Sequence, residues 1–143
     1  MKNAKQLLQD KLRPGIFSVP PDATVFQALQ LMAEKDIGAL LVMENETLLG
    51  IFSERDYARK VVLQGKTSAA TPIRDIMTAK VVFARPSSSI DECMALMSER
   101  RIRHLPVMDS NVVVGVLSIT DLVRAQIAEQ QFVIEQLEHY IHG

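Results

Sequence analysis

The chain has 143 residues, of which 48% are hydrophobic, and its formal net charge is −1 at pH 7. This length and composition can bury a substantial core, and the near-neutral charge argues against bulk attraction to nucleic acid or anionic membranes. A single cysteine excludes a disulfide framework. No segment is apolar over a membrane-spanning length, and the N-terminus does not resemble a secretory signal, so we expect a cytoplasmic protein.

The first expected element is an amphipathic helix at the N-terminus. Its apolar face consists of Ala4, Leu7, Leu8 and Leu12, and Pro14-Gly15 would end it. The apolar residues 16–19 then predict a short strand. Thr24 and Gln27 follow as a capping box that opens a second helix.

Two further strands and a helix complete this first unit. Residues 39–43 and 48–52 are apolar runs too short for helices, and the turn residues 44–46 separate them. Ser53 stands where the second run ends and is a good N-cap for a helix, with Asp56 three residues later. The order of elements is β-α-β-β-α.

The same unit recurs 65 positions later without a gap. Gly50-Ile-Phe-Ser-Glu-Arg-Asp56 is matched by Gly115-Val-Leu-Ser-Ile-Thr-Asp121, and the capping box by Ser89 with Glu92. An internal repeat of this kind predicts one fold used twice. We therefore expect a first domain at 1–75, with the N-terminal helix, the first repeat and the connector. The second domain would be 76–143, with the second repeat and a C-terminal helix.

The C-terminal tail is expected to be one long helix. Residues 125–141 contain no helix breaker and carry Ile127, Ile134, Leu137 and Ile141 at near-heptad spacing. Packing within one chain would explain this stripe, and so would a seam between two copies. We favour a homodimer, because the last helix of the second repeat is complete by about residue 130.

The duplicated unit resembles a tandem CBS-domain pair, the Bateman module, of the stand-alone bacterial type. The motifs that carry the likeness are Gly-φ-φ-Ser-x-x-Asp (φ apolar) in both repeats, His104-Leu-Pro-Val107 and Ile76-Met77-Thr78. The likeness covers about residues 14–130. It implies an α+β fold in which two repeats pack as a pseudo-twofold pair, with the N-terminal and C-terminal helices as additions. It also implies regulatory binding of adenosine-containing ligands in clefts between the repeats.

The doubled Ser-x-x-Asp segment fits two interpretations. A hydroxyl and amide groups at a helix N-terminus can bind phosphate, and a carboxylate in the first turn can accept hydrogen bonds from a ribose diol. The same residues also make ordinary helix caps, each worth about 1 kcal/mol. The resemblance favours the ligand-binding interpretation.

Each cleft, by position in the family, would combine residues of both repeats. The first would hold Ser53, Arg55, Asp56, Thr78, Val82, Ile102, Arg103 and His104. The second would hold Phe17, Ile37, Gly38, Ala39, Ser118, Thr120 and Asp121. The first cleft is basic and the second is largely apolar, so we expect tight polyphosphate binding only in the first.

The favoured function is a regulatory sensor that binds AMP, ADP, ATP or NAD and passes its state to an unidentified effector protein. The alternatives are a ligand-free dimeric interaction scaffold and a sensor of S-adenosylmethionine. Nucleic acid is not an expected partner, because the basic run 100–104 is short and lacks interleaved aromatic residues. A membrane is not expected either, because the net charge is close to zero.

We do not expect an enzyme, a catalytic cofactor or a metal site. Cys93 falls on the apolar face of a helix, where a nucleophile would be buried. Of the three histidines, His104, His139 and His142, the last two lie in the tail with no partnered Cys or carboxylate at metal-ligand spacing, and we expect a structural or surface role for each. Neither of the common glycine-rich nucleotide-binding motifs is present.

Overall fold

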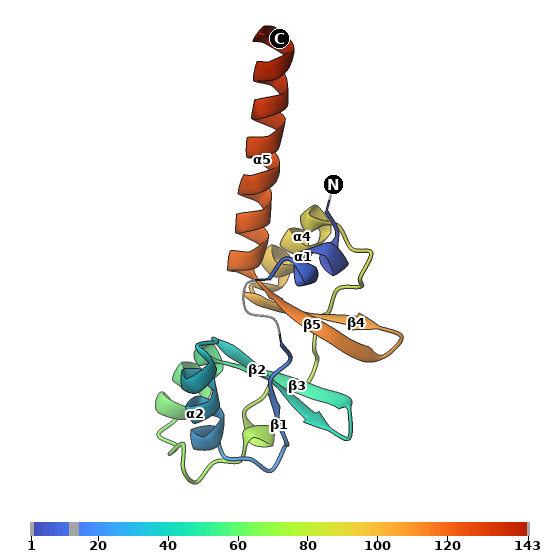
Figure 1. The fold of residues 1–143 in the computed structure, drawn as a ribbon. Coiled ribbons are helices and arrows are strands. Elements are labelled where there is room, and N and C mark those ends of the chain that lie inside the picture. The colour runs from blue at the N-terminus through green and yellow to red at the C-terminus, as the bar shows by residue number, and fades with distance from the viewer. Residues whose placement is uncertain (1, 12–14, 143) are drawn as a thin grey trace. The chain divides into compact units, whose positions relative to one another are not determined.

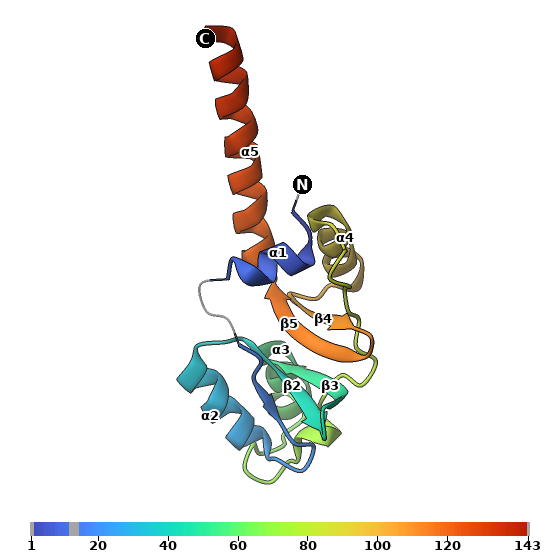
Figure 2. The same cartoon turned by 45° about the vertical axis from the view of Figure 1, so that its right-hand side comes forward.

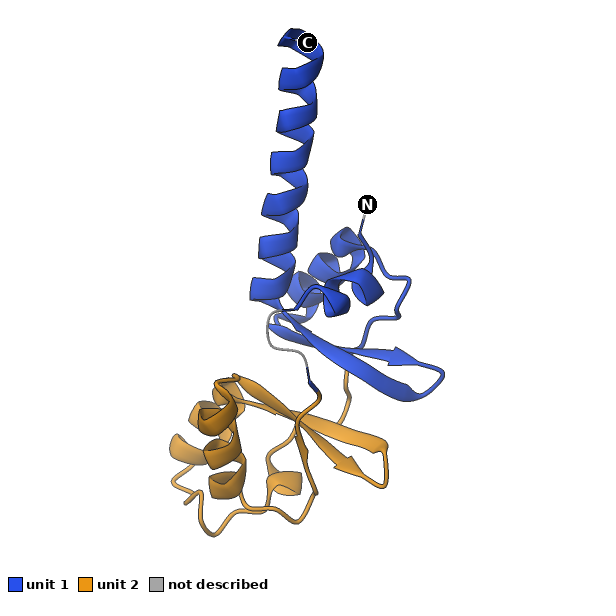
Figure 3. Ribbon diagram, viewed as in Figure 1, with its two compact units in different colours: residues 1–15, 82–143 blue, residues 16–81 orange. Residues whose placement is uncertain are grey.

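The computed structural model describes residues 2–11 and 15–142, and its contacts divide the chain into two compact units (Figure 3). Unit 1 comprises residues 1–15 and 82–143, and unit 2 comprises residues 16–81. Leu12 and Pro14, which were expected to complete and end the N-terminal helix, lie outside the described residues. Each unit contains one repeat and mixes helices with a small sheet, which confirms the α+β class.

Unit 2 holds the first repeat in the expected order of elements. They are β1 (Ser18–Val19), α2 (Val25–Lys35), β2 (Ala39–Glu44), β3 (Thr47–Ser53), α3 (Glu54–Asp56), the π-helix η1 (Tyr57–Val62) and the 3-10 helix η2 (Ile73–Asp75). The sheet order is β1-β2-β3, with β1 parallel and β3 antiparallel to β2. The predicted capping box forms: Thr24 Oγ1 accepts the Gln27 N–H at 3.1 Å, and Gln27 Oε1 accepts the Thr24 N–H at 2.9 Å.

Unit 1 holds the second repeat together with both terminal helices. Its elements are α1 (Ala4–Gln9), α4 (Ile90–Arg100), β4 (His104–Asp109), β5 (Val112–Ser118) and α5 (Ile119–His142), of which β4 and β5 form an antiparallel pair (Figure 1). Ser89 Oγ accepts the Glu92 N–H at 3.1 Å and so caps α4, but among the described bonds only this half of the predicted capping box is present.

The backbone repeats its irregular features as well as its elements. Asp36 and Arg101, 65 positions apart, both end their helices in the left-handed conformation at a φ of 55°. The hairpins turn through residues 45–46 and 110–111, and all four of these residues have positive φ, as a two-residue type I′ turn requires. Equivalent sequences therefore encode equivalent local conformations in both units.

The first strand of the second repeat is shorter than predicted. In unit 2, the Leu41 N–H donates to the Phe17 carbonyl at 3.3 Å and helps to hold β1. The equivalent of Leu41 is Pro106, which has no N–H to donate. Only the isolated bridge between Ala84 and Val107 therefore remains in the described part of unit 1, at the position of the β1–β2 pair Val19–Val42.

Two equivalent glycines allow different segments to cover the two sheets. A Cβ on Gly50 would lie 2.6 Å from Met77 Sδ and 2.9 Å from the Thr78 carbonyl oxygen. A Cβ on Gly115 would lie 2.5 Å from Leu8 Cδ2. The segment after η2 thus packs on β3, and α1 packs on β5. This is why residues 1–15 group with the second repeat and residues 76–81 with the first, whereas the expected domains followed chain order.

Helix α5 extends well beyond the rest of unit 1 (Figures 1 and 2). It is 24 residues long, and Leu122 is its buried residue. Every described residue from Gln130 to His142 is exposed. Within the described part of the chain, no helix combines the length and apolarity needed to cross a membrane.

Candidate functional site

The candidate site in unit 2 is the junction between β3 and α3. Ser53 is the N-cap, and its Oγ accepts the Asp56 N–H at 3.2 Å. The Asp56 carboxylate reaches back, and its Oδ2 accepts the Ser53 N–H at 3.0 Å. This reciprocal pair is a capping box in which aspartate takes the place of the usual glutamate. The sequence-predicted capping geometry is therefore present.

The junction between β5 and α5 in unit 1 repeats this geometry. Ser118 Oγ accepts the Asp121 N–H at 3.1 Å, and Asp121 Oδ2 accepts the Ser118 N–H at 2.8 Å. The exposed fractions of the two aspartate side chains are close, at 13% for Asp56 and 14% for Asp121. Each carboxylate is thus held at the start of a helix, where the helix dipole stabilises negative charge.

Each aspartate also has a lysine partner, and the two lysines come from different parts of the chain. Lys60 Nζ lies 3.2 Å from Asp56 Oδ1, one helical turn away, and donates to the Ile76 carbonyl at 3.1 Å. The equivalent of Lys60 in the second repeat is Ala125. Lys11, from the segment after α1, instead lies 3.2 Å from Asp121 Oδ2 and donates to the Val116 carbonyl at 2.6 Å.

Sequence reasoning missed this pair of lysines. The mismatch between Lys60 and Ala125 was visible in the repeat, and it signalled that the two sites differ. The sequence could not predict that Lys11 takes the place of Lys60, because Lys11 lies 105 positions away along the chain from Val116, to whose carbonyl it donates. Lys11 is also the more enclosed of the two, with 19% of its side chain exposed against 44% for Lys60.

The start of the middle strand lies beside the helix start in both units. In unit 1, His104 is the register partner of Ser118, and the Arg103 carbonyl accepts the Ile119 N–H at 2.8 Å. In unit 2, Ala39 is the register partner of Ser53, and the Gly38 carbonyl accepts the Glu54 N–H at 3.1 Å. The structure therefore brings together predicted site residues of the same repeat.

His104 has an electrostatic environment that disfavours its charged form. Burial lowers the pKa of His104 below its ordinary value, the positive charges of Lys11 and Arg103 lower it further, and the negative charge of Asp121 opposes them. The imidazole is therefore neutral near pH 7. It can donate one hydrogen bond and accept another, which suits a polar ligand atom.

The remaining predicted residues lie in the segments next to the strands, except Arg55, which lies in α3. Thr78 exchanges two backbone hydrogen bonds with Ile51 of β3, at 2.9 and 3.0 Å. Phe17 and Ile37 pack against the core of unit 2, and the Phe17 ring lies 5.4 Å from Lys35 Nζ. Val82 and Ile102 pack against the core of unit 1. Arg55 is exposed on the first turn after Ser53.

The combination of residues from both repeats into two clefts stays a prediction, because the structure describes each unit by itself. Unit 2 contains Phe17, Ile37, Gly38, Ala39, Ser53, Arg55, Asp56 and Thr78. Unit 1 contains Val82, Ile102, Arg103, His104, Ser118, Thr120 and Asp121.

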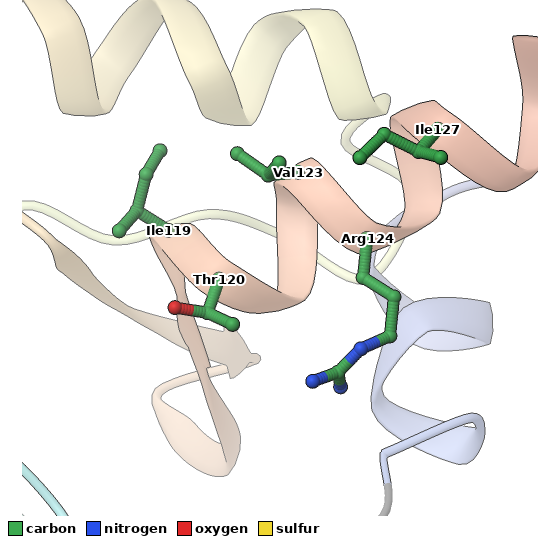
Figure 4. Close-up of a pocket in the computed structure, with 5 residues that line it drawn as sticks. All are labelled: Ile119, Thr120, Val123, Arg124 and Ile127. Carbon is green, nitrogen blue, oxygen red and sulfur yellow. The ribbon is translucent and has the colours of Figure 1, made fainter.

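Thr120 also borders a hollow on the surface of unit 1 (Figure 4). This hollow has a volume of about 380 Å³ and lies along the first two turns of α5. Its lining residues are Ile119, Thr120, Val123, Arg124 and Ile127.

The described residues include no cluster of three or more His, Cys, Asp or Glu that could hold a metal ion. Cys93 is buried in the core of unit 1, and burial raises the pKa of its thiol, with the nearby charge of Glu92 adding to the effect. A buried, protonated thiol is a poor nucleophile.

The chain belongs to the CBS-domain family. The family model matches twice, over residues 6–63 and 73–128, and so covers both repeats. A curated relative is the mitochondrial CBS domain-containing protein CBSX3 of Arabidopsis thaliana, 39% identical over 127 residues. The match covers 85% of this chain, which spans 62% of the length of that relative.

Solved structures confirm the fold of a CBS-domain pair. A proposed signal-transduction protein with CBS domains from Burkholderia ambifaria MC40-6 is 51% identical with a TM-score of 0.86, covering 90% of this chain and 96% of the other. The CBS domain pair of protein MJ0100 is 24% identical with a TM-score of 0.79, and the match covers 90% of this chain and 98% of the other. That protein was solved in complex with 5′-methylthioadenosine and S-adenosyl-L-methionine, and its likeness to this chain shows the fold alone.

Proposed function

We propose that this chain is a sensor that binds AMP, ADP, ATP or NAD and transmits the bound state to an effector protein. As a tandem CBS protein it belongs to a class of regulatory modules that bind adenosine-containing ligands and are not generally catalytic. The observation that carries the proposal is the doubled helix start, where an aspartate held by its N-cap serine lies beside a lysine. We expect this chain to act without catalysis, as a homodimer in the cytoplasm.

In this proposal, Asp56 and Asp121 accept hydrogen bonds from the ribose diols of the ligands. The amide groups at the same helix starts would face phosphate groups, and Lys60 and Lys11 would supply nearby positive charge. Each lysine already neutralises its aspartate in the ligand-free chain. A phosphate that approached would offer the ammonium group a second anionic partner.

The proposed first cleft joins Asp56 to Arg103 and His104 of the other repeat. Charge-assisted hydrogen bonds to phosphate are stronger than neutral ones, so this cleft should prefer phosphorylated ligands. The second cleft would join Asp121 to Gly38 and Ala39, which bring no charge. Within unit 1, Lys11 places a positive charge beside Asp121 of this second cleft.

Two other functions have specific support. The serine–aspartate bonds satisfy helix-capping needs without any ligand, which favours a ligand-free dimeric scaffold. The ligands of MJ0100 favour an S-adenosylmethionine sensor as a further alternative. A thermal-shift panel of AMP, ADP, ATP, NAD and S-adenosylmethionine separates the three, because a ligand at about 100 times its Kd stabilises by about 2.7 kcal/mol.

Calorimetry with AMP and adenosine tests the proposed roles of Asp56 and Arg103. Asp56→Ala should weaken both ligands, because both carry the ribose diol. Arg103→Ala should weaken AMP by about 1.5–3 kcal/mol, the range for hydrogen bonds to charged groups, and leave adenosine nearly unchanged. Ser89→Ala is the matched control, since it removes a helix cap outside the proposed clefts. Equal losses of AMP and adenosine in Arg103→Ala would contradict a phosphate contact, and no binding of any ligand would favour the scaffold.

A further inference from the structure

Helix α5 carries an apolar stripe that unit 1 leaves exposed. Its exposed apolar residues are Val123, Ile127, Phe132, Val133, Ile134, Leu137, Tyr140 and Ile141. Beyond Gln130 the helix has no buried residue in its described part, so its own unit does not cover the stripe. Apolar side chains gathered along one exposed helix are typical of a surface that binds another protein segment.

Six residues of α5 follow a seven-residue repeat. With Ile127 at heptad position a, Ile134 and Ile141 also take position a, and Val123, Gln130 and Leu137 take position d. Apolar side chains at a and d form the seam by which two helices pair. The polar exception, Gln130, costs stability in such a seam but restricts the registers that are tolerated.

We propose that α5 pairs with α5 of a second copy of this chain in antiparallel orientation, with Ile127 of each copy facing Leu137 of the other. In an antiparallel pair, position a of one helix faces position d of the other. The same register places Val123 against Ile141 and Gln130 against Ile134, so that all six seam residues meet seam residues. The inference rests on the proposed homodimer and requires no ligand.

The charges beside the seam favour this orientation. Arg124 and Glu138 take position e, and in the antiparallel register each lies near the other residue of the second copy, which gives two opposite-charge pairs. In a parallel pair, position g faces position e of the next heptad. Gln126 would then face Gln131, and Val133 would face Glu138, so neither contact would pair opposite charges.

The hollow along the first turns of α5 also fits an antiparallel partner. Figure 4 shows Ile119, Val123 and Ile127 in a row along the helix. In the proposed register, Ile141 and Leu137 of the second copy lie against Val123 and Ile127 and cover these two residues of the row. A parallel pair would instead place one hollow against the other and leave both unfilled.

Disulfide trapping distinguishes the two orientations. The variants Ile127→Cys and Leu137→Cys are prepared separately in the full chain, one with an affinity tag that changes its mass, and Cys93 stays because it is buried. After mixing, exchange and mild oxidation, the antiparallel pair predicts a mixed disulfide dimer between the two variants. Each variant alone should cross-link at most a tenth as much. Strong self-cross-linking of Ile127→Cys would overturn the proposal in favour of a parallel pair.

Charge reversal gives a second test that does not depend on cysteine geometry. Arg124→Glu should raise the dimer dissociation constant about tenfold, because it places like charges opposite each other at both ends of the seam. Adding Glu138→Arg should restore the dimer. The control Glu135→Arg reverses a charge at heptad position b, away from the seam, and should change little. If the double variant dimerised no more tightly than Arg124→Glu alone, the proposed register would be contradicted. The thermal-shift panel of ligands tests the sensor function separately from this dimer.

Discussion

Asp56 and Asp121 show how one side-chain position can have the same role in two repeats through different partners. Both accept a hydrogen bond from the N-cap serine, and both have a lysine at 3.2 Å. Lys60 belongs to the same helical stretch as Asp56, whereas Lys11 reaches Asp121 from the N-terminal segment. The site at Asp121 therefore depends on the N-terminal segment, whereas the site at Asp56 has its lysine within its own repeat.

This difference predicts that Lys11→Met destabilises the chain more than Lys60→Met. Lys11 is mostly enclosed and also donates to the Val116 carbonyl, so its loss leaves a carboxylate and a carbonyl without that donor. We expect a cost of about 1.5–3 kcal/mol, as for hydrogen bonds to charged groups. The half-exposed Lys60 pair should contribute about 0.2–1 kcal/mol. Urea unfolding of both variants measures the difference. Equal losses of unfolding free energy would show that the enclosed Lys11 pair contributes no more than the half-exposed Lys60 pair.

At the scale of elements, α1 functions as a cover for the second repeat. It packs on β5 and α5, and its capping box at Asn3 and Gln6 starts the helix where Ala4 is fully buried. Gly115 permits this approach, because any Cβ at that position would meet the side chain of Leu8. The equivalent Gly50 has the Thr78 carbonyl as its neighbour, which cannot rotate away.

Substitution of these glycines should therefore have unequal effects. Gly115→Ala should destabilise by about 1–3 kcal/mol, as overpacking does, and Leu8→Ala in the same chain should recover part of that loss. Gly50→Ala should cost more, because a backbone oxygen lies in the way. Denaturant unfolding of the single and double variants measures both effects. An unchanged midpoint for Gly115→Ala would mean that α1 does not pack on β5 as closely as described.

At the scale of the whole molecule, the described part of α5 beyond Gln130 is exposed, and we expect it to hold two copies together. A chain that ends after Gln130 loses Ile134, Leu137 and Ile141 from the proposed seam. Sedimentation equilibrium should then show a weaker dimer or a monomer. Phe132→Ala in the full chain is a suitable control, since it removes an exposed apolar residue outside the seam positions. An unchanged dimer constant after truncation would remove the tail from the interface.

The sequence by itself determined the repeated local structure of this protein. The caps at Thr24 and Ser89, the helix starts at Ser53 and Ser118, and the two hairpins were all predictable. These features depend on side chains that bond to backbone groups three residues away, or on turn residues between apolar runs. Such signals are local, so they survive in each copy of the unit. The family likeness followed from the same motifs.

Only the tertiary structure decided which distant segments complete each repeat. Nothing near Asp121 in the chain indicates that Lys11 would be its partner, because that contact depends on α1 packing across β5. The shortened first strand of the second repeat depends likewise on Pro106, whose missing N–H matters only once two strands are adjacent. Contacts between residues far apart in sequence form when whole elements pack together, and no short motif encodes them.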